Sequence, residues 1–177
     1  MSRVNHAQLQ SSIRDILDFP TPGIVFKDIS PLLGDGPLFR SVIDELAEIA
    51  SNTELSKIVA IDARGFVFGA AVAYKLGLGF IPIRKKGKLP YKTVGSSYQL
   101  EYGDAAMEIH IDALNPGEAT VLVDDLLATG GTSASAVNLV QKLGGSVKAA
   151  LFVIELDFLH GRAKLPPDVP VHSLIRF

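Results

Sequence analysis

The sequence predicts an α/β fold in which a parallel sheet is flanked by helices. Short strands alternate with helices, and each strand is apolar along almost its whole length instead of at every second residue. Strands of this kind are covered on both faces, as those of parallel sheets are. Strand, turn, helix and strand occur twice, at Lys57–Ile61, Arg64-Gly65, Phe66–Leu76 and Phe80–Ile83, and at Thr120–Val123, Ala128–Thr132, Ser133–Leu143 and Val147–Ile154.

Two helices are expected before the first strand. Asn5 is a favourable N-cap and apolar residues follow it at helical spacing, so we expect a helix over Asn5–Leu17. The segment Phe19–Gly23, which is rich in proline, ends this helix. From Pro37 to Ala50 the apolar residues form one stripe and acidic residues lie opposite, which predicts a second, amphipathic helix.

A long polar segment, Lys85–Ser97, lies between the two strand-helix units and precedes a further expected strand, Met107–Ile111. It shows neither helical nor strand periodicity. Within a compact domain such a segment is more often an active-site loop than a plain connection. The basic cluster Arg84–Lys88 stands at its start and is expected to serve a small anionic ligand, although a run of charge is also typical of a solvated surface.

Composition excludes several classes of protein. The 177 residues fit one domain, 1–177, and a net charge of −2 gives no overall attraction to nucleic acid. There is no cysteine, so the chemistry uses no thiolate nucleophile or thiolate metal site. The longest apolar runs fall far short of the roughly 20 residues that span a bilayer, and the first residues do not resemble a secretory signal. We therefore expect a cytoplasmic protein without a membrane or nucleic-acid partner.

The strongest chemical signal lies between Val121 and Thr132. An apolar strand delivers two adjacent carboxylates, Asp124 and Asp125, to the sheet end where ligands of α/β proteins bind. The turn that follows offers flexible glycines, hydroxyl donors and a helix N-terminus, which together suit a phosphate; it consists of Ala128, Thr129, Gly130, Gly131 and Thr132. Carboxylates repel phosphate but accept hydrogen bonds from hydroxyls, so the pair points to a ribose phosphate. The alternative is that the acidic pair only caps the following helix.

The acidic pair followed by Ala-Thr-Gly-Gly-Thr resembles the signature with which type I phosphoribosyltransferases bind 5-phosphoribosyl-1-pyrophosphate (PRPP). Within that superfamily the chain is most similar to the adenine phosphoribosyltransferase family. The similarity rests on five further blocks in the family's order, which are Phe19–Pro31, Ala63–Phe66, Ile83–Pro90, Leu100–Gly103 and Gly161–Leu165.

The resemblance implies a type I phosphoribosyltransferase fold with a small N-terminal hood, mainly within residues 1–35. It implies a transferase, more narrowly a glycosyltransferase and pentosyltransferase, that joins adenine to the ribose of PRPP. The reaction releases pyrophosphate and gives AMP in purine salvage. Mg²⁺ would bind with PRPP and not directly to protein ligands. The family also implies a homodimer.

The resemblance assigns the base to the hood. Phe26 lies in a segment rich in Pro and Gly without periodicity, where a flat ring can stack on a purine. Backbone groups near Val25 and Lys27 would read the edge of adenine, and Leu127 would cover the opposite face. The alternative is that Phe26 packs into the hydrophobic core.

The turn Ala63-Arg64-Gly65 suits pyrophosphate. It follows a strand directly, so its N–H groups and the Arg64 guanidinium point to the same sheet end as Asp124. The resemblance implies a non-proline cis bond between Asp62 and Ala63. The alternative is an arginine tied to a structural carboxylate such as Asp62.

The polar loop would close over pyrophosphate and exclude water. Arg84 and Lys85 would bind pyrophosphate, while Lys88 and Tyr102 would take part in closure. The middle of the loop, Tyr91–Ser97, departs from some family members, so no closed-loop contact is assigned there.

Glu101 lies at the end of this loop and would assist proton movement on the purine. The expected catalytic residues are therefore Glu101, Arg64 and Asp125. The alternative is that Glu101 pairs with Lys85 or Arg84 and only organises the loop.

Two other functions stay open at this point. One is a related enzyme that acts on xanthine, hypoxanthine or orotate, because recognition by backbone groups hides base choice from the sequence. The other is a regulatory protein that senses PRPP without catalysis. Such proteins typically carry a nucleic-acid-binding extension or a basic surface, and no long basic N-terminal segment is present here.

Overall fold

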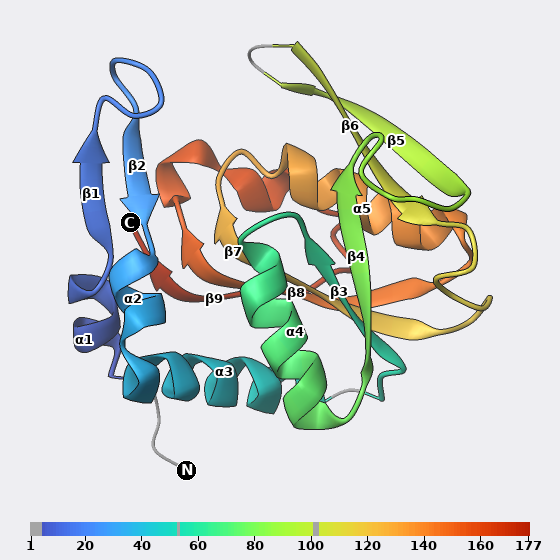
Figure 1. The fold of residues 1–177 in the computed structure, drawn as a ribbon, viewed down its shortest axis with the longest axis horizontal. Helices are drawn as coiled ribbons and strands as arrows, with labels where there is room; N and C mark the ends of the chain where they lie inside the picture. The colour runs from blue at the N-terminus through green and yellow to red at the C-terminus, as the bar shows by residue number, and fades with distance from the viewer. Residues whose placement is uncertain (1–4, 53, 101–102) are drawn as a thin grey trace. The chain divides into compact units, whose positions relative to one another are not determined.

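The computed structural model describes residues 5–52, 54–100 and 103–177, without the side chains of residues 97–100 and 103–105. The chain divides into two compact units, Met1–Leu46 and Ala47–Phe177 (Figure 1). Among the residues that the structure describes, no helix is both long enough and apolar enough to cross a membrane.

The first unit shows that the helix expected over Asn5–Leu17 is correct only in its first half. Its elements are α1 (His6–Ser11), β1 (Arg14–Leu17), β2 (Val25–Asp28), α2 (Ser30–Gly34) and most of α3 (Gly36–Ser51). Asn5 caps α1 as expected, since its side chain accepts a hydrogen bond from the Gln8 N–H at 3.1 Å. The second half is a strand because β1 pairs antiparallel with β2, and this non-local pairing overrides the helical spacing.

The turn between β1 and β2 falls where Phe19–Gly23 was expected to end the first helix. Asp18 and Gly23 both have positive φ, 56° and 87°. The Gly23 N–H donates to the Asp18 carboxylate at 2.7 Å, which closes the turn. The helix expected from Pro37 to Ala50 is confirmed as α3.

The second unit is built on a seven-stranded sheet in the order β5-β6-β4-β3-β7-β8-β9. Its strands are β3 (Lys57–Ile61), β4 (Gly79–Lys85), β5 (Thr93–Leu100), β6 (Gly103–His110), β7 (Ala119–Leu127), β8 (Ser146–Glu155) and β9 (Val171–Arg176). Strands β4, β3, β7, β8 and β9 run parallel, whereas β6 is antiparallel to both β4 and β5. The expected α/β class is confirmed, and the antiparallel edge and β9 are additions to it.

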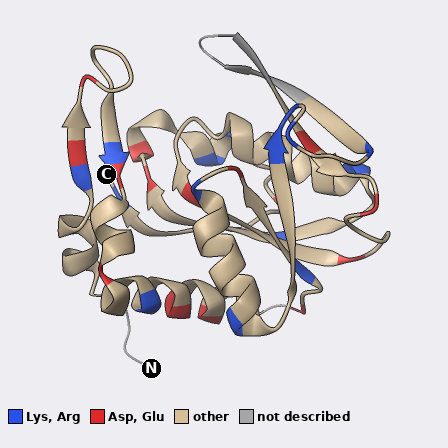
Figure 2. Cartoon of the chain, in the orientation of Figure 1, with Lys and Arg blue, Asp and Glu red and all other residues tan. Residues whose placement is uncertain are grey.

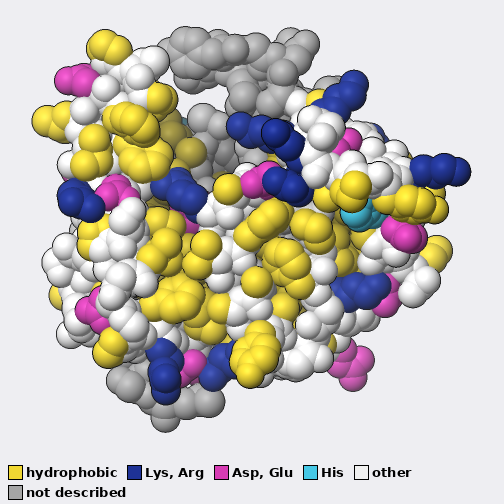
Figure 3. All heavy atoms as spheres, in the orientation of Figure 1, with side chains coloured by type: hydrophobic (Ala, Val, Ile, Leu, Met, Phe, Trp, Pro, Cys, Tyr) yellow, Lys and Arg dark blue, Asp and Glu magenta, His cyan; other side chains and the backbone are white. Residues whose placement is uncertain are grey.

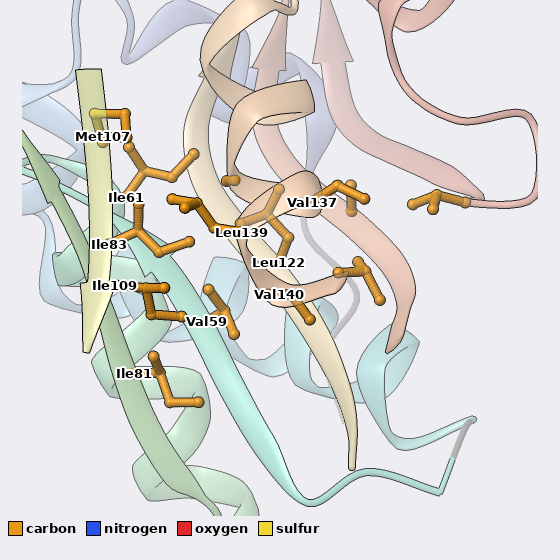
Figure 4. Packing of buried hydrophobic residues seen from close by; sticks show 14 of the residues in the cluster. Val59, Ile61, Ile81, Ile83, Met107, Ile109, Leu122, Val137, Leu139 and Val140 are labelled. Carbon is orange, nitrogen blue, oxygen red and sulfur yellow. The ribbon is translucent and has the colours of Figure 1, made fainter. Parts of the chain in front are cut away.

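Helices α4 (Gly65–Leu76) and α5 (Gly131–Lys142) cover opposite faces of the sheet. On α4, Gly69 approaches Ala60 of β3 so closely that an added Cβ would lie 2.5 Å from the Ala60 Cβ. Val59, the neighbour of Ala60, belongs instead to a buried cluster with Val137 and Val140 of α5 (Figure 4). Because successive side chains of a strand point to opposite faces, the two helices lie on opposite sides of β3.

The polar segment Lys85–Ser97 is not the long loop that its lack of periodicity predicted. Its second half belongs to β5, which pairs with β6 along its whole length from Thr93 to Leu100. Only residues 86–92 connect β4 to β5. Polar residues of high strand propensity, such as Thr93, form a strand here because a partner strand is available, and the sequence pattern does not report a partner.

Candidate active site

One pocket gathers the two turns that the sequence singled out. Strands β3 and β7 are parallel neighbours, so the turns at their carboxyl ends meet at one edge of the sheet. The pocket has a volume of about 250 Å³ and is lined by Ile61, Asp62, Ala63, Arg64, Asp124, Asp125, Leu126, Ala128, Thr129, Gly130, Thr132 and Ser133. All these residues belong to the second unit.

The phosphate turn, residues 128–132, leads directly into α5. Gly130 is the N-cap of this helix and has a φ of 80°, a conformation that side chains other than glycine rarely adopt. No side chain caps the helix and its first turn has no acidic residue, so the alternative in which the acidic pair serves as a cap is wrong. The first N–H groups of a helix lack intrahelical partners, which makes the start of a helix suited to an anion.

The two carboxylates lie within β7 and do not follow it, because the strand runs four residues beyond Val123 to Leu127. Asp124 Oδ1 accepts the backbone N–H of Asp125 at 2.9 Å. Gly65 packs against the same carboxylate, and an added Cβ there would lie 2.5 Å from Asp124 Oδ1. The first residue of α4 must therefore be glycine for Asp124 to keep its place.

Burial raises the pKa of both carboxyl groups in this acidic pair. Desolvation raises the pKa of Asp124 well above its ordinary range, and the negative charge of Asp125 raises it further. Desolvation also raises the pKa of Asp125, against the opposing effect of the Arg64 guanidinium. Arg64 NH2 lies 2.8 Å from Asp125 Oδ2 as an ion pair, although that oxygen has no well-aligned hydrogen bond.

The turn after β3 contains the non-proline cis bond between Asp62 and Ala63 that the family resemblance implied, and that expectation is confirmed. The alternative partner for Arg64 is wrong: Asp62 pairs with Arg84, whose Nε donates to Asp62 Oδ2 at 2.9 Å. Arg84 also donates to the Lys88 carbonyl at 3.0 Å. The two arginines thus hold different carboxylates at neighbouring strand ends.

The basic turn, residues 86–90, is held by a carboxylate that the sequence analysis did not single out. Glu108 is buried on β6 and accepts hydrogen bonds from Gly87 N–H at 2.9 Å, Leu89 N–H at 3.2 Å and Thr93 Oγ1 at 3.0 Å. Burial raises the pKa of Glu108, but these donors outweigh burial and the net pKa is lowered. One signal was present, since Glu108 is an acidic residue placed directly between the apolar residues Met107 and Ile109 of an expected strand.

The lysines of this region remain outside the pocket lining. Lys85 and Lys88 are exposed, and Figure 2 marks Lys and Arg positions in blue along the ribbon at the carboxyl end of β4 and in the turn after it. The expected contact of Lys85 with pyrophosphate and the expected part of Lys88 in loop closure both stay predictions. Glu101 and Tyr102 lie outside the described residues, so their expected roles also stay predictions.

The residues expected to hold the base belong to different units. Val25 is 45% exposed, Phe26 is half-buried with its ring edge-to-face against Phe19 at 5.2 Å, and Lys27 pairs with Asp15 at 2.7 Å. These residues lie in the first unit. Leu127 lies in the second unit, where its side chain is fully buried in the core and offers no surface to a ligand in this conformation. The expectation that they sandwich adenine stays a prediction.

Comparisons with known proteins agree with this site. Residues 33–173 match the model of the phosphoribosyl transferase domain family. The chain is 54% identical to an adenine phosphoribosyltransferase of Nitrosococcus oceani over 96% of its own length and 99% of that relative. It also matches the crystal structure of the Rhodothermus marinus adenine phosphoribosyltransferase, with 48% identity, a TM-score of 0.93 and coverage of 97% and 98% of the two chains.

A further similar structure carries ligands. The adenine phosphoribosyltransferase of Saccharomyces cerevisiae, complexed with adenine and an imino-altritol bisphosphate, is 38% identical to the chain with a TM-score of 0.90. The match covers 96% of this chain and 98% of the yeast chain.

Proposed function

The chain belongs to the adenine phosphoribosyltransferase family, and on this premise we propose that it transfers the 5-phosphoribosyl group of PRPP to adenine. The products are AMP and pyrophosphate, which makes the protein a pentosyltransferase of purine salvage. One observation carries the proposal: a single pocket joins the phosphate turn, the acidic pair and Arg64. These groups suit the phosphate, the ribose hydroxyls and the pyrophosphate of PRPP.

The chemistry follows from this arrangement. The bond from ribose C1 to the pyrophosphate oxygen breaks, its electron pair leaves with pyrophosphate, and C1 bonds to a ring nitrogen of adenine. Carboxylates at Asp124 and Asp125 stabilise the positive charge that grows on the ribose. Hydroxyl groups that donate to these carboxylates favour their ionised form and so offset the rise in pKa caused by burial. Arg64 stabilises pyrophosphate, for which it leaves Asp125.

Mg²⁺ enters the proposal as a companion of PRPP. Among the described residues, no three or more His, Asp or Glu side chains gather where they could hold a metal ion. Asp125 Oδ2 is buried without an aligned hydrogen bond, and a carboxylate oxygen is a donor that Mg²⁺ accepts. Mg²⁺ would still bind with PRPP and not directly to these carboxylates, and Asp124 and Asp125 are the acidic residues of the pocket that it would approach. The ion would neutralise charge on the phosphates of the substrate.

Base recognition is proposed for the first unit, which would act as the hood of one phosphoribosyltransferase domain. Phe26 would stack on adenine, the backbone near Val25 and Lys27 would read its edge, and Leu127 would line the opposite side. Phe26→Ala should then raise the Michaelis constant for adenine far more than that for PRPP, since stacking contributes about 1–3 kcal/mol per base. Equal changes in the two constants would assign Phe26 to packing instead.

Loop closure and proton transfer are proposed for the segment around Glu101. Arg84 and Lys85 would bind pyrophosphate, and Lys88 and Tyr102 would take part in closure over it. Glu101 would relay the proton that adenine loses. Glu101→Gln should slow the single-turnover rate by at least about tenfold and leave PRPP affinity nearly intact, since positioned acid–base groups contribute about 10²–10⁴-fold. A normal single-turnover rate with weaker PRPP binding would make Glu101 a loop anchor.

We also propose a homodimer whose contact includes the outer face of α4. Val67 and Tyr74 on this helix are 41% and 91% exposed, and Phe80 of β4 is 36% exposed. Figure 3 shows hydrophobic side chains gathered over α4 and β4. Lys75 is the sole charged residue of α4, and a helix so apolar on all sides is typical of one buried in an assembly.

The dimer is tested by sedimentation equilibrium of Tyr74→Glu, which should be monomeric. Tyr91→Glu is the matched control, because Tyr91 is also an exposed tyrosine but belongs to the connection between β4 and β5 and not to α4. A dimeric Tyr74→Glu protein would move the proposed contact to another face.

The decisive assay compares initial rates with adenine, guanine, hypoxanthine, xanthine and orotate in the presence of PRPP and Mg²⁺. Adenine should be the preferred substrate and guanine a poor one, because guanine presents an oxo acceptor where adenine presents an amino donor. Preference for an oxo base would assign the chain to a related activity, and PRPP binding without turnover would make it a sensor. We also propose that the protein works in the cytoplasm and has no nucleic-acid or membrane partner.

A further inference from the structure

One block of the family resemblance, Gly161–Leu165, has no role in the proposed function. It forms a short 3₁₀ helix, η2 (Gly161–Lys164), that follows η1 (Asp157–Leu159) and lies between β8 and β9. His160, which precedes η2, has a positive φ of 52° and so turns the chain sharply. We call residues 160–164 the backing turn.

The backing turn packs against the phosphate turn backbone to backbone. A Cβ added to Gly161 would lie 2.1 Å from the Ala128 carbonyl oxygen and 3.1 Å from the Gly130 nitrogen. A Cβ added to Gly130 would lie 2.2 Å from the Gly161 carbonyl oxygen. Neither position has room for a side chain, so each turn limits the positions that the other can take.

The next residue anchors the backing turn to the sheet. Arg162 NH2 donates to Glu155 Oε2 at 2.6 Å, its Nε donates to the other carboxylate oxygen, and its NH1 donates to the Val171 carbonyl at 2.8 Å. Ser173 also donates to Glu155 Oε2 at 2.6 Å. Arg162 thus joins the last residue of β8 to the first residue of β9. Glu155 is buried, with only 2% of its surface exposed.

This anchor also reaches the strand that carries the phosphate turn. Glu155 pairs with Leu127 in the register of β7 and β8, and the Leu156 N–H donates to the Leu127 carbonyl at 2.9 Å. Leu127 immediately precedes the phosphate turn. The phosphate turn is therefore held at its start by β8 and at its middle by Gly161.

We propose that Arg162 and Glu155 are positioning residues for phosphate binding, and that they act through Gly161 on the N–H groups of residues 130–132. The inference rests on the proposed function only in naming the 5-phosphate of PRPP as the ligand. Donors that are fixed in place before binding cost less conformational entropy when the ligand arrives. A small displacement of such donors can lower affinity strongly.

The test compares Arg162→Ala with Arg176→Ala. Arg176 lies 3.5 Å from the same Glu155 carboxylate but does not belong to the backing turn, which makes it a matched control. Arg162→Ala should weaken ribose 5-phosphate binding in calorimetry by at least about tenfold, raise the Michaelis constant for PRPP similarly and spare that for adenine. Arg176→Ala should change each value less than about twofold, as exposed ion pairs contribute little.

Amide hydrogen exchange separates positioning from general stability. Residues 130–132 should exchange faster in Arg162→Ala while the rest of α5 keeps its protection. If Arg162→Ala does not fold, Arg162→Lys, which keeps the charge but loses the two-pronged contact, should show the same pattern. Unchanged exchange and affinity in a folded Arg162 variant, or equal losses for PRPP and adenine, would overturn the inference. A different outcome would be that wild type does not bind ribose 5-phosphate, although residues 130–132 exchange faster in Arg162→Ala. That result would refute the proposed function but would keep the conclusion that Arg162 holds the phosphate turn in place.

Discussion

The phosphate turn and the basic turn are both assigned to anions, yet they are built in opposite ways. The phosphate turn is fixed by backbone contact with Gly161, and four of its residues, Ala128, Thr129, Gly130 and Thr132, line the pocket. The basic turn instead gives the N–H groups of Gly87 and Leu89 to the Glu108 carboxylate and leaves Lys86 and Lys88 exposed.

This difference separates two modes of anion recognition within one unit. Backbone donors on a rigid turn bind a group of defined shape and location, as a terminal phosphate is. Lysine side chains on long stems can follow a group that moves or departs, and their charge acts over a longer range. The phosphate turn therefore suits the part of the substrate that stays bound, whereas the basic turn suits the leaving pyrophosphate.

The largest effect is expected where the backbone contact is broken. Gly130→Val places a branched side chain at a φ of 80°, where an added Cβ would lie 2.2 Å from the Gly161 carbonyl oxygen. PRPP binding in calorimetry should fall by more than about 100-fold, since misplaced groups at a site can cost that much. The far-ultraviolet circular dichroism spectrum should be retained, because the sheet does not depend on this turn. Unchanged PRPP affinity would remove the phosphate turn from the site.

A smaller effect is expected when the basic turn loses its anchor. Glu108→Gln keeps the shape but accepts fewer hydrogen bonds, so it should lower the free energy of unfolding by about 1–3 kcal/mol. The Michaelis constant for PRPP should rise severalfold in steady-state kinetics. Glu118→Gln is the matched control, because Glu118 also accepts a backbone N–H, that of Asn115, and in addition pairs with Lys57. Glu118 lies just before β7 begins, whereas the acidic pair of the pocket lies near the carboxyl end of β7. Glu118→Gln should change stability without changing the Michaelis constant for PRPP.

The same anchor predicts a dependence of stability on pH. The pKa of Glu108 is lowered in the folded chain from an ordinary 4.5, because backbone and hydroxyl donors favour its charged form. The unfolded chain binds more protons, so this stabilisation is complete above about pH 4.5 and is lost as pH falls through the lower folded value. As pH falls, the melting temperature in thermal unfolding should therefore drop more steeply for wild type than for Glu108→Gln. Parallel acid profiles for the two proteins would contradict this assignment.

The smallest effect is expected from a single exposed lysine. Lys88→Ala should raise the Michaelis constant for PRPP about two- to fivefold at low salt, and the difference should shrink as ionic strength rises, because exposed charges are screened. Lys148→Ala removes an exposed lysine of β8 and should leave the Michaelis constant for PRPP unchanged. An effect of Lys88→Ala that resists salt would mean that this lysine is buried by the ligand.

The parts of the fold that could be predicted are those with local signals. Strand β3 and helix α4 were expected within a residue of their observed bounds, since an apolar run, a glycine turn and a helical pattern follow one another directly. Strands β1, β5 and β9 depend instead on pairing with a partner strand outside their own segment. Thr93 pairs with His110 and Val171 with Ala150, and no pattern within either segment shows that pairing.

The candidate site likewise has parts with local sequence signals and parts that depend on distant residues brought together by the fold. The two turns of the pocket were expected because glycines, hydroxyls and carboxylates at a strand end are visible in the sequence. The choice of ion-pair partners was not visible, since Arg64 holds Asp125 while Arg84 holds Asp62. Glu108 was missed for a related reason: its three partners lie 15–21 residues away and come together only when β6 pairs with β4 and β5.

We expect the ion pair between Arg64 and Asp125 to make the pocket selective for molecules that carry both an anionic group and hydroxyl donors. An anion that draws Arg64 away leaves a buried carboxylate without its counter-charge, and this cost opposes binding. A molecule that also brings hydroxyl donors compensates Asp125 in the same event. Pyrophosphate alone should therefore bind more weakly in calorimetry than pyrophosphate added with ribose 5-phosphate. The ion pair thus couples the two binding events, so that the anion and the hydroxyl donors should bind with positive cooperativity.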